Sequence, residues 1–251
     1  MKILFIVLFL AGQQLFAIIS IVPVKIGENP GISTKMQAGL DTKRGYTDRD
    51  FYKASVRITY DENYNYVLWG EISGVYGKSN GQETTNKSFA HLRFIHALTK
   101  KNIRDEYFIQ AQENKFKAIK TRRLVGGGLR FTLFETFKGA KGYLGVGGFY
   151  EYLSYTNPVL DPNENNIRIN TYFSYKATFN KDSHLAYTMY YQPRINNFRD
   201  QLILNKFELQ LQVYPKLYLK FSVYYNLDSS PPSSIYKNYG FRQTTTFVYD
   251  F

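Results

Sequence analysis

Three histidines, His91, His96 and His184, are the side chains best suited to act as a general base near neutral pH. A histidine that activates a serine needs the hydroxyl group within hydrogen-bonding reach. Neither His91 nor His96 has a serine within the next two positions. Ser183 is adjacent to His184, but neighbouring residues of an extended strand point to opposite faces. We therefore expect no catalytic site and no enzyme activity.

The other polar motifs do not predict a metal or cofactor site. Segment 161–166 is rich in carboxylate and amide groups, but it lacks the glycine and the ligand spacing of a calcium loop. The glycine-rich segments 126–128 and 145–148 are not phosphate-binding loops, because no helix follows them. In adjacent strands they would relieve crowding or let a sheet bend. The chain has no cysteine, which excludes disulfides and thiolate metal sites.

Charged residues recur at alternate positions of short segments, which places them on one face if the segments are strands. The basic residues of this face are Lys35, Lys53, Arg57, Arg93, Arg122, Arg130, Arg168, Lys176, Lys206, Lys220 and Arg242, and the acidic ones are Asp41, Glu71, Glu106, Glu151, Glu208 and Asp250. A narrow interior lined in this way favours anions or acidic sugars. Alternatively the charges pair and fill the interior, and the sequence leaves both possibilities open.

The segments that position these charges have the period of β-strands. Residues 52–60 are the clearest case, because apolar or aromatic residues at even positions alternate with polar residues at odd positions. Tyrosines at both ends of this apolar stripe are typical of membrane interfaces. Twelve such strands are predicted, near residues 34–42, 51–61, 65–76, 87–99, 104–115, 121–134, 141–155, 167–180, 183–192, 201–214, 218–227 and 239–251.

The connections between these segments alternate in length. Short turns are predicted at 61–64, 100–103, 135–140, 180–182 and 215–216, and longer loops at 43–50, 77–86, 116–120, 156–166, 193–200 and 228–238. A β-sandwich has no reason to keep this order, whereas an up-and-down barrel inserted from one side of a membrane does. We therefore predict a single antiparallel transmembrane β-barrel of about twelve strands over residues 34–251.

The start of the chain resembles a secretory leader. Lys2 precedes an apolar run of signal-peptide length, which predicts a signal peptide over residues 1–17, followed by an irregular periplasmic lead-in over 18–33. Beyond the leader no apolar stretch reaches 18 residues, so helical membrane spans are excluded. The mean hydropathy of −0.36 suits a barrel, in which every second strand residue faces a polar interior.

The last residues and the net charge predict the environment and the partners. Phe247, Tyr249 and Phe251 lie on one face of the final strand and resemble the signal that the outer-membrane assembly machinery reads. The net charge of +12 is scattered at strand spacing without a basic run, which argues against nucleic acid. We expect a bacterial outer-membrane location, contact with lipid and lipopolysaccharide, and no cofactor.

A stretch from about Phe89 to Tyr155 carries further markers: the segments 107–112 and 121–130, and the glycines at 145–148 before Glu151. In these markers the chain resembles the salt-induced outer membrane protein (YdiY-like) family, over a quarter to half of its length. That family is one of unknown function. The resemblance implies an outer-membrane barrel and no catalytic residues.

These observations favour a non-enzymatic barrel that is a small passive channel for anionic solutes or acidic saccharides. In such a channel Arg57, Arg93, Arg122 and Arg130 would select anions, because guanidinium groups stay charged at any working pH. The first alternative is a structural or osmotic-stress envelope protein with a side-chain-filled lumen. The second is an outer-membrane lipid hydrolase, which the histidine contexts disfavour.

Overall fold

The computed structural model describes residues 26–27, 30–45, 48–98, 102–136, 139–180, 183–215 and 217–249. The predicted signal peptide, residues 1–17, lies outside these ranges, as does most of the predicted lead-in over 18–33. No helix within these ranges is long and apolar enough to cross a membrane.

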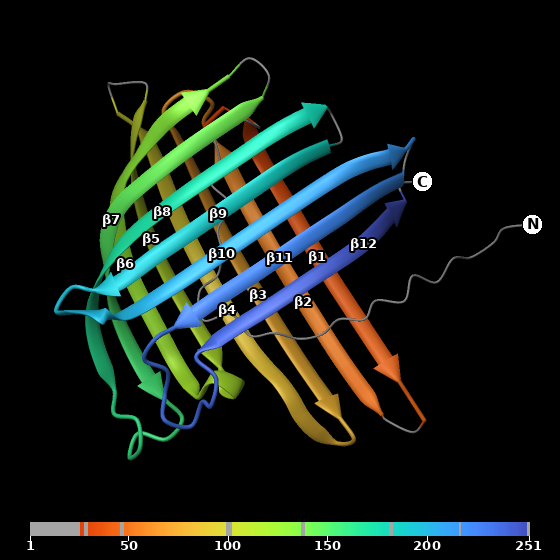
Figure 1. The fold of residues 1–251 in the computed structure, drawn as a ribbon, viewed down its shortest axis with the longest axis vertical. Coiled ribbons are helices and arrows are strands. Elements are labelled where there is room, and N and C mark those ends of the chain that lie inside the picture. Colours follow the sequence, from red (N-terminus) through yellow and green to blue (C-terminus); the bar gives the residue numbers. More distant parts are fainter. Residues whose placement is uncertain are drawn as a thin grey trace, which may run out of the picture.

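Twelve strands and one short 3-10 helix make up the described chain (Figure 1). The strands are β1 (Gly31–Lys43), β2 (Arg49–Asp61), β3 (Tyr66–Ser79), β4 (Gln82–Ala97), β5 (Ile103–Asn114), β6 (Ile119–Glu135), β7 (Ala140–Tyr155), β8 (Glu164–Asn180), β9 (Ser183–Arg194), β10 (Asn197–Tyr214), β11 (Leu217–Asp228) and β12 (Tyr239–Tyr249), with η1 (Lys115–Lys117) between β5 and β6. Each strand pairs antiparallel with the next along the chain, in one sheet ordered β1 to β12. The prediction of an all-β chain with twelve up-and-down strands is confirmed.

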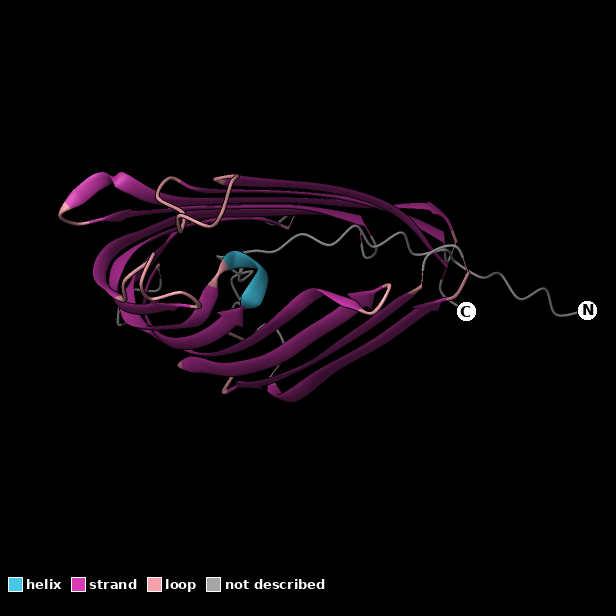
Figure 2. Cartoon of the chain, turned by 90° about the horizontal axis from the view of Figure 1, so that it is seen from below, coloured by secondary structure: helices cyan, strands magenta, loops and turns pink. Residues whose placement is uncertain are grey.

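The sheet curls on itself. In Figure 1, β8 to β12 run in front of β1 to β4 at a steep angle, and Figure 2 shows these layers as two sides of one curved sheet. Among the described residues no pairing joins β12 to β1, so both are edge strands. Closure of the predicted barrel therefore stays a prediction.

Two of the predicted long loops are wrong. The predicted loop 77–86 is a tight hairpin, in which only Asn80 and Gly81 separate β3 from β4, with φ angles of 48° and 79°. Positive φ at both central residues is what such a turn requires, and Asn-Gly is its usual sequence. The predicted loop 193–200 is also mostly strand, because only residues 195–196 separate β9 from β10. Long connections remain at 156–163 and 229–238, at the same end of the sheet.

The described end of the lead-in contacts the sheet. β1 begins at Gly31, three residues before the predicted start at 34. Ile26 is buried against Val67 of β3 and Ile95 of β4. The backbone N–H of Gly27 donates a hydrogen bond of 2.8 Å to the carboxylate of Asp61 at the end of β2. These contacts place this part of the chain against the inner face.

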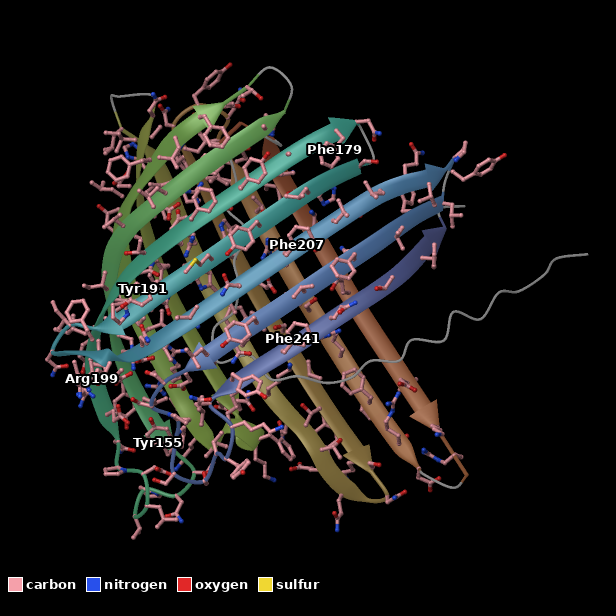
Figure 3. All side chains as sticks on the ribbon, in the orientation of Figure 1. Tyr155, Phe179, Tyr191, Arg199, Phe207 and Phe241 are labelled. Carbon is pink, nitrogen blue, oxygen red and sulfur yellow. The ribbon has the colours of Figure 1, made fainter. Side chains whose placement is uncertain are left out.

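The alternation of side chains gives the sheet two faces of different chemistry, and side chains project from both (Figure 3). On the outer face large apolar groups stay exposed, including Met36 of β1, Ile72 of β3 and Phe247 of β12. The inner face holds buried charged residues together with clusters such as Tyr172, Tyr190, Leu202 and Leu204. An apolar outer face around a polar interior is the reverse of the distribution expected in water.

Candidate functional site

The interior of the curved sheet contains a buried ion-pair cluster whose first part joins β4, β5, β6 and β8. Glu106 of β5 forms ion pairs with Arg130 of β6 and, at 3.7 Å, with Arg93 of β4. The hydroxyl of Tyr172 on β8 donates a hydrogen bond of 2.7 Å to Glu106 and accepts one of 2.9 Å from Nε of Arg130. Side chains thus reach across the interior between strands that are not neighbours.

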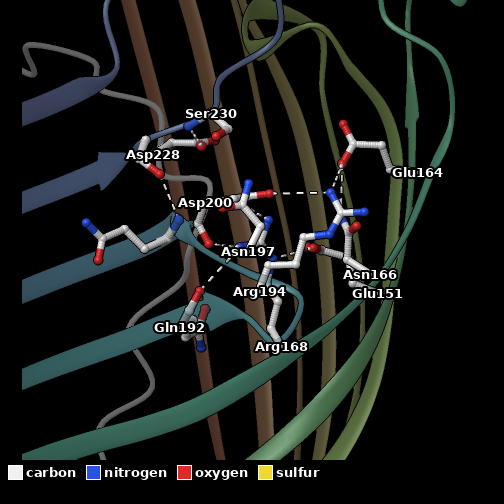
Figure 4. Close-up of polar contacts among 12 residues, drawn as sticks. Glu151, Glu164, Asn166, Arg168, Gln192, Arg194, Asn197, Asp200, Asp228 and Ser230 are labelled. Atoms are coloured by element: carbon white, nitrogen blue, oxygen red, sulfur yellow. Dashed lines mark hydrogen bonds and ion pairs between the residues drawn. The ribbon is translucent and has the colours of Figure 1, made fainter.

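The second part of the ion-pair cluster lies nearer the end that carries the long connections (Figure 4). Glu151 of β7 pairs with Arg122 of β6 and, at 2.9 Å, with Arg168 of β8. Arg168 also pairs with Asp200 of β10 at 2.8 Å and donates to the backbone carbonyl groups of Gln192 and Asp200. Arg168 therefore ties β7, β8, β9 and β10 together at one point.

The residues of the ion-pair cluster are almost completely buried. They are the four arginines Arg93, Arg122, Arg130 and Arg168 and the three carboxylates Glu106, Glu151 and Asp200, each 4% exposed or less. Buried charges of this kind persist only when they are paired and hydrogen-bonded. This side of the interior is therefore filled by side chains.

Glycines on β6 and β7 make room for the ion-pair cluster. A Cβ atom on Gly145 would lie 2.0 Å from the ring of Tyr172, which lies opposite it in register. A Cβ atom on Gly126 would lie 2.5 Å from Phe149. The prediction that these glycines relieve crowding between adjacent strands is confirmed.

The other side of the interior is a basic cavity. Its volume is about 610 Å³, and its walls come from β1 to β5 and from β10 to β12. Its charged lining consists of the basic residues Lys35, Lys53, Arg57, Lys87, Lys206, Lys220 and Arg242 and the acidic residues Glu71, Glu113 and Glu208. Positive charge therefore exceeds negative charge on the walls of this basic cavity.

Some cations of the basic cavity are neutralised by neighbours. Arg57 donates to Glu71 at 2.8 Å and lies over the ring of Trp69 at 4.5 Å. Lys220 and Lys206 share Glu208, at 3.3 and 3.8 Å. In contrast, Lys35, Lys53 and Lys87 make no hydrogen bond or ion pair with another described residue. These three lysines are free positive charges on the walls of the basic cavity.

The basic residues predicted to line the interior thus fall into two groups, with Lys176 outside both. Lys53, Arg57, Lys206 and Lys220 line the basic cavity, as do Lys35 and Arg242. Arg93, Arg122, Arg130 and Arg168 belong to the ion-pair cluster. Lys176 lies on the inner side of β8 and is partly buried. Two further charged residues of the interior, Lys87 and Asp200, are not among the predicted ones, although Lys87 has the same strand parity as Arg93.

The three histidines lie apart from one another. His91 is buried, its ring stacks on Trp69 at 4.8 Å, and its Nδ1 lies 3.1 Å from Gln110. His96 contacts Asp105 at 3.1 Å, and His184 contacts Glu208 at 3.4 Å. In the part of the chain that the structure describes, no group of three or more histidine or carboxylate side chains is arranged to hold a metal ion.

The predicted assembly signal is only partly described. Phe247 is 62% exposed on the outer side of β12. Tyr249 is the last residue of that strand, and Phe251 lies outside the described residues.

Twelve consecutive antiparallel strands with an apolar outer face and a charged inner face define an all-β protein of the up-and-down type. The chain belongs to the family described as "Protein of unknown function, DUF481", whose model matches residues 36–251. The match runs from β1 to the end of the chain, well beyond the stretch from Phe89 to Tyr155 that carries the resemblance. No curated protein matches the chain.

Proposed function

We propose that the protein is a non-enzymatic bacterial outer-membrane barrel whose interior takes up small anionic solutes in the basic cavity. The proposal has two parts: that the outer face contacts lipid, and that the interior attracts anions. Each part rests on a different set of residues and has its own test.

The outer face supports contact with lipid. Met36 is 74% exposed and Ile72 is 70% exposed, although both are large and apolar. An apolar depression of about 560 Å³ on this face runs over β2 to β6, with Ile72, Leu92 and Ile109 among its walls. Large apolar side chains exposed side by side over a sheet face mark a contact surface. Membrane lipid, including lipopolysaccharide, is the contact that suits a belt of this kind.

The membrane location has a direct test. Outer-membrane barrels keep their strands folded in cold detergent, so we expect the unheated protein in isolated outer membranes to migrate differently on a gel from the heated protein. Equal mobility, or recovery of the protein in the soluble periplasmic fraction, would contradict the proposal. Dependence of insertion on the barrel assembly machinery would be tested by depleting that machinery.

The observation that carries the anion proposal is the set of three free lysines, Lys35, Lys53 and Lys87, on the walls of the basic cavity. Lys87 lies close enough to Lys53 and Arg242 to interact electrostatically with both. Like charges held together between low-dielectric walls raise the local potential and concentrate anions. A small inorganic or organic anion, or an acidic saccharide, is the class of solute that this arrangement favours.

Conductance in a planar bilayer tests the anion proposal. We expect the zero-current potential across a salt gradient to have the sign of an anion-selective channel. The double substitution Lys53→Glu with Lys87→Glu should shift this potential toward that of a cation-selective channel. Arg123→Glu is the matched control, because Arg123 is exposed on the outer face and lies outside the basic cavity. An unchanged potential in the double variant would contradict the assignment of these lysines.

A second candidate, a structural envelope protein, is favoured by the ion-pair cluster. Arg130 and Glu151 are each 1% exposed or less, so the interior around them has no room for a solute path. If this filling extends through the whole interior, the bilayer experiment would give no conductance above background. That result would leave the structural function in place of the channel.

Among the residues that the structure describes, no contact of a histidine with a serine supports the lipid hydrolase alternative. The ring of His91 is enclosed by Trp69 and Phe108, and its Nδ1 atom lies within hydrogen-bonding distance of Gln110. Lipid turnover that disappears in His91→Ala or His184→Ala would revive this alternative.

A further inference from the structure

A small polar cavity lies between the two parts of the ion-pair cluster. Its volume is about 30 Å³, well below that of the basic cavity. Its polar lining comes from Arg93, Arg122, His91, Gln110, Asn170 and Gln192, and the remainder is apolar or aromatic. About 15 Å³ is enough to hold one water molecule, so this cavity has room for one or two particles of that size.

The charges around this small cavity do not balance. In the second part, Arg122 and Arg168 face Glu151 and Asp200. Arg194, which also contacts Asp200, and Asp228, which interacts with Arg122 and Arg168, add one charge of each sign, so this part is neutral. In the first part, Arg93 and Arg130 share the single carboxylate Glu106. One positive charge is therefore left over. Each of the seven charged residues of the ion-pair cluster is at most 4% exposed, so this charge is buried. A buried charge without a counterion is strongly unfavourable.

Arg93 is the residue that carries this excess. Its nearest carboxylate contact, 3.7 Å to Glu106, is too long for a hydrogen bond, whereas Arg130 and Tyr172 hold Glu106 closely. Arg93 is 3% exposed, and its Nε and Nη1 atoms make no hydrogen bond. A guanidinium group can only donate hydrogen bonds, so these two positions require an acceptor.

We propose that the small cavity binds one chloride ion, with the guanidinium group of Arg93 as its principal ligand. Arg122 adds a second positive charge to the wall. Asn170 accepts a hydrogen bond from Gln192 through its side-chain oxygen, at 2.8 Å, which leaves the amide hydrogens of Asn170 available for an anion. A monatomic halide fits the volume and supplies both the acceptor and the missing negative charge.

A water molecule is the competing occupant. Water would accept a hydrogen bond from Arg93, but it would leave the positive charge uncompensated in a region from which solvent is excluded. The halide site is also separate from the basic cavity, with which it shares no charged residue. The proposal of a halide site is therefore independent of whether the protein conducts ions through its interior.

Bromide gives the direct test, because its anomalous X-ray signal distinguishes it from water. Crystals of the full chain grown in sodium bromide should show one buried anomalous peak within hydrogen-bonding reach of Arg93. Absence of a peak at this position would overturn the proposal, even with bromide bound at the protein surface.

Thermal unfolding gives a second test in solution. At equal ionic strength, sodium chloride or bromide should raise the melting temperature of the wild-type protein above its value in sodium gluconate, whose anion is too large for the cavity. A shift of about 2–4 °C or more is expected for a chain of this size. Equal melting temperatures in chloride and gluconate would overturn the proposal.

Variants assign the effect to this site. Arg93→Met removes the excess charge, so its melting temperature should no longer distinguish chloride from gluconate. Arg123→Met is the matched control, since it removes an exposed arginine from the outer face and should keep the chloride effect. If Arg93→Met keeps the full effect, the ion binds elsewhere and the proposal is wrong. If Arg93→Met does not fold, the bromide experiment on the wild-type protein decides.

Discussion

The hydroxyl group of Tyr172 on β8 donates a hydrogen bond of 2.7 Å to the carboxylate of Glu106 on β5, across the two strands that lie between them. The two residues are 66 positions apart in the sequence. The contact forms because the strand residue opposite Tyr172 is Gly145, which has no side chain to hold the ring away. A single glycine thus allows the ion-pair cluster to extend across the interior.

Gly145→Ala should therefore destabilise the protein. The added methyl group would meet the Tyr172 ring at 2.0 Å, so the ring must move and its hydrogen bonds to Glu106 and Arg130 are strained or lost. Overpacking of this kind costs about 1–3 kcal/mol, measurable by urea unfolding in lipid vesicles. Gly74→Ala is the control, because a Cβ atom there has nothing within 4 Å. Equal effects of the two substitutions would contradict this account.

Glu151→Gln should have a larger effect. It removes the negative charge that pairs with both Arg122 and Arg168 in a region closed to solvent. Loss of one partner from a buried ion pair costs about 3–5 kcal/mol, because the other charges stay buried. The same unfolding measurement applies. Glu83→Gln breaks a pair with the exposed Lys115 and should cause little change.

Lys117 in η1 should make stability depend on pH. Burial lowers the pKa of Lys117 to about 8, Asp228 opposes this shift, and Arg122 and Lys87 add to it. Below pH 8 the amine is charged in both states, so the folded protein bears the full cost of burying the charge. Between pH 8 and the ordinary pKa of 10.5, the unfolded state holds the proton and the folded state does not. The free energy of unfolding should therefore rise with pH across this window.

Lys117→Met should raise stability at pH 7 and remove its share of the rise between pH 8 and 10.5, measured by unfolding at a series of pH values. Lys115→Met changes an exposed lysine of the same helix and should keep the wild-type profile. A Lys117→Met profile parallel to that of the wild type would show that another group causes the dependence.

The sequence was sufficient to predict the strands and their two faces. The period of two is local, so Arg57 and Tyr60 could be assigned to opposite faces from their spacing alone. The loop predicted around Asn80-Gly81 is wrong although the signal of the turn is also local, because the polar residues around it fit a loop as well. That error concerned the length of strands and not their number.

The pairing inside the sheet could not be predicted in the same way. Strand parity places both Arg122 and Lys53 on the inner face. Only the curvature of the sheet brings Glu151 and Arg168 close to Arg122. The same curvature leaves Lys53 on a wall of the basic cavity. Asp200 falls in the predicted loop 193–200, and its pairing with Arg168 depends on the irregular register between β9 and β10. Contacts across the interior depend on the whole fold.

Ile72→Arg would distinguish a sheet that faces lipid from one that faces water. Ile72 is 70% exposed near the middle of β3, on the apolar outer face. At the midplane of a bilayer an arginine costs about 2–4 kcal/mol, whereas on a water-exposed surface a substitution changes stability by about 0.5 kcal/mol or less. Ile32→Arg makes the same change near the start of β1, where a membrane interface would reduce the cost to about 0–1 kcal/mol. We expect unfolding in lipid vesicles to show a large loss for Ile72→Arg and a small one for Ile32→Arg. Small and equal losses would mean that the outer face contacts water, which would remove the membrane part of the proposed function and leave the interior contacts as they are.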